Sequence, residues 1–233
     1  MRFAPMAIAA SALFAAAAHA DVILIDDFNQ PGITTITDTT VGGALVTTGA
    51  QTLITPNLAN SREVQVDLAL QNLPGGITAN VGGGANGVLN VSVATGDNGT
   101  ARVIWTLPAT PIGNPASYSF AVVASALGSL SNTAVNNQVA FAFTGPGGNF
   151  SIPNLGIGAF AFALPATVVN FNLAASQALA LSGGGTLTMT LTGGQGWNLT
   201  LDQFAITVPE PTSLALVGLA LVGAGFASRR RSA

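Results

Sequence analysis

Much of the chain alternates between apolar and polar residues with a period of two, which is the pattern of a strand that buries one face. Thr186–Thr192 is the clearest case, with three apolar residues between four threonines, and Arg62–Leu70 follows the same pattern. Clear strands are predicted at 62–70, 88–94, 101–107, 117–124, 138–144, 168–173, 186–192 and 197–207. Weaker strands are predicted at 22–25, 33–37 and 44–48.

Segments rich in glycine, proline and asparagine separate these strands. Leu73-Pro74-Gly75-Gly76 and Gly96-Asp97-Asn98-Gly99 are examples, and such residues favour turns. Many short strands joined by turns predict an all-β fold, an antiparallel β-sandwich or barrel. A short helix within 121–130 is an alternative for that stretch and would not change the class. No fixed-period repeat is present, which disfavours a solenoid.

The last predicted strand changes its inward face part of the way along. Trp197, Leu199 and Leu201 share one parity, whereas Phe204 and Ile206 have the other. The change near Asp202-Gln203 predicts a β-bulge, which can re-aim a side chain.

The N-terminus has the order of features that export requires. Arg2 precedes a small-apolar run from Phe3 to Ala18, and Ala18-His19-Ala20 fits the cleavage pattern of signal peptidase at Ala18 and Ala20. We therefore expect residues 1–20 to be a signal helix and Asp21 to begin the mature protein. The alternative is an Ala-rich helix that stays on the protein.

The composition changes again after residue 207. Pro209, Glu210 and Pro211 precede the uncharged segment 212–227, which is followed by a basic end at 228–233. Sixteen helical residues span about 24 Å, close to a bilayer core, and arginines can snorkel across the remainder. We expect a transmembrane helix at 212–227 with its basic end in the cytoplasm, carried by Arg229, Arg230 and Arg231. A plain membrane anchor is the alternative.

This C-terminal arrangement resembles the PEP-CTERM sorting signal. The resemblance covers 208–231 and rests on Pro209-Glu210-Pro211, the apolar helix and the terminal arginines. It implies that exosortase, a membrane-embedded cysteine enzyme of Gram-negative bacteria, processes the chain. It also implies an inner-membrane intermediate, then the cell surface or an extracellular matrix, with a link to exopolysaccharide, biofilm or floc formation. The predicted domains are therefore 1–20, 21–207 and 208–233.

The region 21–208 holds very few charges. It keeps two cations, Arg62 and Arg102, against eight carboxylates, a net charge of −6. Phosphate binding requires Lys and Arg, so neither nucleic acid nor an anionic membrane surface is expected as a partner of this region. The eight carboxylates are Asp21, Asp26, Asp27, Asp38, Glu63, Asp67, Asp97 and Asp202.

Most catalytic constellations lack their parts. The chain has no cysteine or lysine, and its one histidine, His19, lies in the predicted signal peptide. Serine triads, cysteine nucleophiles, Schiff-base lysines and the usual zinc sites are therefore excluded from the mature region. We expect no enzyme activity and no cofactor. A weak glycoside hydrolase is the remaining catalytic alternative, because that chemistry needs only two carboxylates, and Glu63 is the one Glu in 21–208.

Calcium is a further hypothesis, because Ca²⁺ takes carboxylate and carbonyl oxygens. Ile25-Asp26-Asp27-Phe28 and Leu201-Asp202-Gln203-Phe204 resemble the first and last strands of jelly-roll and galactose-binding-like domains. That resemblance implies a jelly-roll-like β-sandwich with a structural calcium held by Asp26, Asp27 and Asp202. The alternative is that Asp26 and Asp27 cap a turn before Pro31-Gly32.

The sequence thus predicts an exported structural or adhesive protein that associates with exopolysaccharide. A calcium-dependent carbohydrate-binding module is the alternative. Signal peptidase and exosortase are the expected partners during export. Four Asn-x-Ser/Thr triplets begin at Asn90, Asn98, Asn149 and Asn198, and we assign them no function, because the composition alone accounts for them.

Overall fold

The computed structural model describes residues 21–29, 32–55, 57–83, 87–110, 118–124, 137–156 and 167–208. Ile23–Ile206 form one compact unit. A second unit comprises Met1–Val22 and Thr207–Ala233, of which only 21–22 and 207–208 are described. The predicted signal helix, sorting motif, transmembrane helix and basic end all lie outside the described residues. Among those residues, no helix is both long and apolar enough to cross a membrane.

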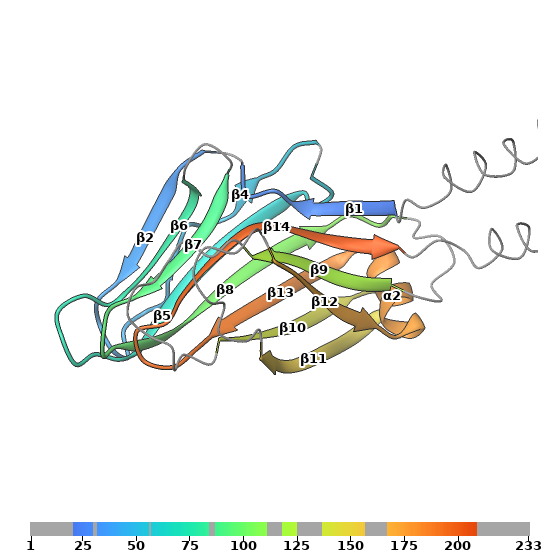
Figure 1. Cartoon of the computed structure of the whole chain (residues 1–233). Coiled ribbons are helices and arrows are strands. Elements are labelled where there is room, and N and C mark those ends of the chain that lie inside the picture. The colour runs from blue at the N-terminus through green and yellow to red at the C-terminus, as the bar shows by residue number, and fades with distance from the viewer. Residues whose placement is uncertain are drawn as a thin grey trace, which may run out of the picture. The chain divides into compact units, whose positions relative to one another are not determined.

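The compact unit is built from two seven-stranded sheets (Figure 1). The first sheet has the order β12-β9-β14-β7-β6-β2, and β1 also pairs with β14. Its strands are β12 (Thr167–Leu173), β9 (Tyr118–Ala124), β14 (Asn198–Val208), β7 (Val88–Val93), β6 (Ile77–Gly83), β2 (Thr34–Asp38) and β1 (Asp21–Asp26).

The second sheet has the order β11-β10-β13-β8-β5-β3, and β4 also pairs with β5. Neighbouring strands run antiparallel throughout this sheet, as they do from β2 to β14 in the first. An antiparallel all-β sandwich is therefore confirmed. The strands are β11 (Gly148–Gly156), β10 (Gln138–Gly145), β13 (Gly185–Thr192), β8 (Asn98–Leu107), β5 (Ser61–Leu70), β3 (Val46–Thr47) and β4 (Gln51–Thr52), and α2 (Ala175–Ser182) joins β12 to β13.

The core lies between the inward faces of the two sheets. Buried and partly exposed residues alternate along β5, β8 and β13, as the period-two pattern predicted. Aromatic side chains bridge the sheets: Trp105 of β8 stacks on Phe204 of β14 at 4.8 Å between ring centroids. Phe141 of β10 meets Phe171 of β12 edge-on at 5.1 Å. Such pairs add to the free energy that burial of their area supplies.

The structure confirms the eight clear strands and adds elements that the pattern did not predict. β8 begins at Asn98, three residues earlier than predicted, and the predicted strand at 44–48 is reduced to Val46–Thr47. β4, β6, β11 and α2 were not predicted. The alternative of a helix at 121–130 is wrong for 121–124, which belong to β9, and 125–130 lie outside the described residues.

Burial along the last strand is interrupted where the change of inward face was predicted. Leu199 and Leu201 are buried, Asp202 and Gln203 are both partly exposed, and Phe204 is buried again. The register with β7 is defined from Asn198 to Leu201, so the change begins one residue after that ladder. Two successive residues facing outward are what a bulged strand produces.

The two ends of the compact unit lie at the same end of the sandwich. β1 pairs with β14, and their arrows point in opposite directions (Figure 1). The start of β1 and the end of β14 therefore lie side by side.

Candidate functional site

Asp26, one of the predicted calcium ligands, forms a buried ion pair with Arg62. Neither side chain is exposed to solvent, and Arg62 Nη1 lies 2.8 Å from both carboxylate oxygens. Asp26 ends β1 in the first sheet, whereas Arg62 lies on β5 in the second. The pair therefore ties the N-terminal strand to the opposite sheet.

The remaining lone pairs and donors of this ion pair are also engaged. Trp105 Nε1 donates to Asp26 Oδ2 at 2.7 Å, and the backbone N–H of Phe28 donates to Oδ1 at 2.8 Å. Arg62 donates to Gln51 Oε1 from Nε at 3.4 Å and from Nη2 at 3.2 Å. Burial raises the pKa of Asp26, while the charge of Arg62 and these hydrogen bonds oppose that rise. We conclude that Asp26 serves the core as the partner of Arg62.

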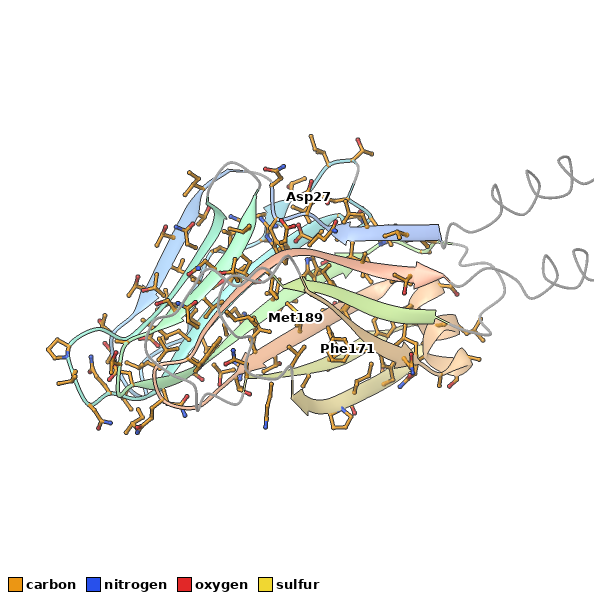
Figure 2. The ribbon with its side chains drawn as sticks, in the orientation of Figure 1. Asp27, Phe171 and Met189 are labelled. Carbon is orange, nitrogen blue, oxygen red and sulfur yellow. The ribbon has the colours of Figure 1, made fainter. Side chains whose placement is uncertain are left out.

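Asp27 caps a turn, as the alternative to calcium predicted. Its Oδ1 accepts from the backbone N–H of Asn29 at 3.0 Å, and Asp26 makes the equivalent bond to Phe28. Asn57 Nδ2 also donates to Asp27 Oδ1 at 3.1 Å. Phe28 adopts a left-handed φ of 55°, which the two carboxylates hold in place. Figure 2 shows Asp27 where the chain leaves β1.

The described structure does not contain the predicted calcium cluster. Among its residues, no three acidic or histidine side chains lie close enough together to hold a metal ion. Asp26 is committed to Arg62 because that cation already contacts both of its oxygens. Asp202 lies on β14 beyond the ladder with β7 and is partly exposed. The grouping of these three residues is therefore not what the sequence predicted, and calcium binding itself stays a prediction.

Asp97 binds the backbone of the loop between β5 and β6. Its Oδ1 accepts from the backbone N–H of Asn72 at 2.7 Å and of Leu73 at 3.2 Å, and Oδ2 accepts from Gly76 at 2.9 Å. The hydrogen bonds from Asn72 and Gly76 lower the pKa of Asp97, because they favour the ionised form.

Asp38 plays a comparable part nearby. Oδ1 accepts from Thr40 and Oδ2 from Leu68, both at 2.9 Å. Asp26, Asp38 and Asp97 are all buried and all bind backbone N–H groups, so these three carboxylates shape loops and do not face a ligand.

The outer face of the second sheet is rich in hydroxyl groups. The four threonines of β13 lie on it, with β8 and β10 on either side. Arg102 lies between Gln65 and Thr190 in the register. Glu63 accepts from Gln65 at 2.9 Å and from Thr47 at 2.6 Å, and these bonds lower its pKa.

The sequence pattern held an unused signal for Arg62. In the strand 62–70, Arg62 has the same parity as Val64, Val66 and Leu68, which are all buried. A cation at an inward position requires a buried anion. Arg62 and its need for a partner were therefore predictable, although nothing in the sequence selects Asp26 among eight carboxylates.

The comparison with protein families matches residues 207–231 to the PEP-CTERM protein-sorting motif. The chain carries an exosortase sorting signal. The PEP-CTERM motif makes the chain an exported protein that is sorted to the cell surface, and it implies processing by exosortase. It covers only the last part of the chain and assigns no activity to the β-sandwich.

No curated protein matches the chain. Several solved structures show a distant likeness. They include the family 11 carbohydrate-binding module of a cellulosomal cellulase of Clostridium thermocellum (8% identity, 83% of this chain and 97% of that chain, TM-score 0.37). Others are the CBM22-1 xylan-binding domain of Paenibacillus barcinonensis Xyn10C (12%, 82% and 97%, 0.33) and the K1 adhesin domain of Lys-gingipain from Porphyromonas gingivalis (15%, 82% and 99%, 0.31). These TM-scores are too low for the likenesses to bear on ligand or activity.

Proposed function

We propose that the mature domain is a non-catalytic structural or adhesive protein of an extracellular matrix, associated with exopolysaccharide in a biofilm or floc. In this proposal, signal peptidase removes residues 1–20, the tail 212–227 holds an intermediate in the inner membrane of a Gram-negative cell, and exosortase then processes the tail. The sorting motif at 207–231 carries the proposal, since it addresses the domain to the cell surface.

The surface chemistry of the domain supports a hydrated, uncharged partner. The threonine hydroxyls of β13 each offer one donor and two acceptor positions, and they form a regular row on the outer face of the second sheet. Region 21–208 has only two cations, and one of them, Arg62, is buried. Neutral hydroxyl groups of a polysaccharide match this surface better than a polyanion does.

The geometry of the carboxylates disfavours a glycoside hydrolase. Glu63 and Asp67 lie on the same face of β5, four residues apart, which is about 13 Å along a strand. Glycosidases hold their two carboxyl groups roughly 5 to 9.5 Å apart. The pKa of Glu63 is lowered, whereas a catalytic acid needs a raised one.

A calcium-dependent carbohydrate-binding module is the second candidate, and it now rests on Asp27 and Asp202 alone. A rise in melting temperature in millimolar calcium that is lost in Asp27→Ala or Asp202→Ala would establish it. An unchanged melting temperature would remove it.

The test of the proposed function compares wild-type cells with cells that lack exosortase. We expect mature protein in the matrix fraction of the wild type, without Arg229, Arg230 and Arg231 by mass spectrometry of its C-terminus. In the deletion strain we expect the full tail and retention in the membrane. A Pro209→Ala/Pro211→Ala variant in wild-type cells should behave like the deletion, and a chain ending at Val208 should be released in both strains. Mature wild-type protein that still ends in the three arginines would contradict the proposal.

A further inference from the structure

Four adjacent strands of the first sheet carry a block of uncharged polar residues. The register of β2, β6, β7 and β14 aligns their residues in rows across these four strands, and two rows consist entirely of such residues. We call these eight residues the amide–hydroxyl patch. They are Thr35, Asn80, Asn90 and Thr200 in one row, and Thr37, Thr78, Ser92 and Asn198 in the next.

The burial pattern gives seven of these residues exposed or partly exposed positions, whereas Thr200 is buried and joins the patch through its hydrogen bond with Asn90. Their neighbours along the strands, among them Ile36, Ala79 and Leu89, are buried in the core. Two of the Asn-x-Ser/Thr triplets form the centre of the patch, because residues two apart share one face of a strand. Asn90 lies opposite Thr200 and Asn198 lies opposite Ser92, so the two triplets face each other reciprocally.

Folding alone does not account for this composition. Asparagine is depleted in strands, yet Asn80, Asn90 and Asn198 lie in β6, β7 and β14, which are neighbours in the sheet. Threonine would serve a half-buried strand better at positions 80 and 198, where the asparagine side chain keeps an unpartnered oxygen. Residues that break a local preference without a structural gain mark functional positions.

The hydrogen bonds within the patch leave two acceptors unused. Asn90 Nδ2 donates to Thr200 Oγ1 at 2.9 Å, and the hydroxyls of Thr37 and Thr78 bond at 3.1 Å. The Oδ1 atoms of Asn80 and Asn198 have no hydrogen-bond partner and are screened from water. An unsatisfied buried acceptor costs about 1–3 kcal/mol. The χ2 torsion of asparagine is broad, so each amide can turn, and binding requires that this turn brings Oδ1 to the ligand.

We propose that the amide–hydroxyl patch binds a neutral glycan chain, an inference that rests on the proposed function and names its surface and ligand class. Glycan hydroxyls would donate to the carbonyl oxygens of Asn80 and Asn198 and accept from the threonine and serine hydroxyls. Two strand spacings and one row separate Asn80 from Asn198, about 12 Å in all, which suits an extended chain lying across the strands.

The charge of the domain selects among glycans. None of the eight patch residues is charged, and region 21–208 has a net charge of −6. A polyanionic glycan would be repelled as a whole and would find no cation in the patch. The ligand is therefore an uncharged polysaccharide.

The experiment is affinity electrophoresis of the 21–208 domain in gels that contain dextran, laminarin, galactan or alginate. Asn80→Thr and Asn198→Thr keep a polar, strand-favouring residue and remove the unpartnered carbonyl. We expect at least one neutral polysaccharide to retard the wild type, and each variant to bind roughly five- to ten-fold more weakly, as loss of one hydrogen bond predicts. Both variants should melt at or above the wild-type temperature. Thr188→Val and Thr190→Val probe the threonine row of β13 as the competing surface. Asn172→Thr, the same change at an exposed position of β12 in the first sheet, is the matched control and should bind as the wild type does.

The outcomes distinguish a failure of the proposed binding surface from a failure of the proposed function. If the wild type is retarded by a neutral polysaccharide but only the Thr188→Val or Thr190→Val variant loses binding, the patch is wrong and the proposed function stands. Equal binding by the wild type and both asparagine variants would likewise show that the patch is wrong and leave the proposed function standing. Retardation by alginate alone overturns the neutral ligand. If none of the neutral polysaccharides retards the wild type, both the patch and the polysaccharide association in the proposed function fall.

Discussion

The stability of the core depends on keeping the buried charges of Asp26 and Arg62 paired. If Asp26 becomes Asn, the guanidinium of Arg62 stays buried without its anion. We expect Asp26→Asn to lower the free energy of unfolding by about 3–5 kcal/mol, as removal of one partner from a buried pair does. Denaturant titration measures this loss. Asp26→Asn/Arg62→Met should recover much of it, and Asp27→Asn should have a much smaller effect. A stability of Asp26→Asn equal to that of the wild type would mean that Arg62 finds another anion.

Asp97 makes stability depend on pH in the acid range. Its folded pKa is lowered below the ordinary value of 3.8, so the ionised form stabilises the fold at higher pH. This contribution is complete above about pH 5 and is lost as the pH falls through the folded pKa. We expect Asp97→Asn to be less stable than the wild type at pH 7, with a difference that shrinks below pH 3.8. A difference that stays constant from pH 7 to pH 3 would refute this role for the carboxylate.

At the scale of residues, the sequence predicted the kinds of contact better than the partners. The turn formed by Asp26 and Asp27 follows from a local rule, because each carboxylate binds a backbone N–H two residues on. The pair of Asp26 with Arg62 joins residues 36 apart, and the loop contacts of Asp97 reach back 21 to 25 residues. No periodicity encodes such distances, so the clustering of Asp26, Asp27 and Asp202 could not be tested from sequence.

At the scale of elements, strands with a strong alternation were predictable and those with interruptions were not. β5, β8 and β13 alternate cleanly and were predicted within three residues. β6 holds Asn80 and two glycines, and β11 holds glycine at its ends and Pro153, all of which weaken a strand pattern. Tertiary pairing makes them strands, with β6 between β2 and β7 and β11 at an edge.

The entry into β6 depends on a glycine. Gly76 has a φ of 89°, and a Cβ there would collide with the carbonyl oxygen of Asp38. We expect Gly76→Ala to destabilise the domain by at least about 1–3 kcal/mol, since it combines backbone strain with a backbone clash. Gly42, with a φ of 68° and open space around its Cβ position, is the matched control. Gly42→Ala should cost less, and thermal unfolding of both variants checks the order. An equal loss at both sites would show that the clash contributes nothing.

At the scale of the whole molecule, scarce charge implies resistance to proteases that cut after basic residues. The region 21–208 offers trypsin only Arg62 and Arg102, and both lie within strands of the second sheet. Cleavage requires the chain to leave its sheet. We expect the folded domain to survive trypsin for hours at protease concentrations that cut the urea-unfolded chain within minutes. Gel electrophoresis of samples taken over time measures the intact chain. Asn72→Arg places a site in a loop and should restore cleavage if the fold, and not the sequence around the arginines, gives the protection. Rapid cleavage of the folded wild type at Arg102 would contradict this.

The place of β14 makes the first sheet depend on the last strand of the domain. β14 lies between β9 and β7 and also pairs with β1, so among the described strands it alone joins the β12–β9 pair to β7, β6 and β2. It is also the last strand made, and it ends at Val208, next to Pro209. The first sheet is therefore complete only when the residues that directly precede the sorting motif at 207–231 have joined it. A chain cut before β14 would leave the β12–β9 pair without the strand that connects it to the rest of its sheet.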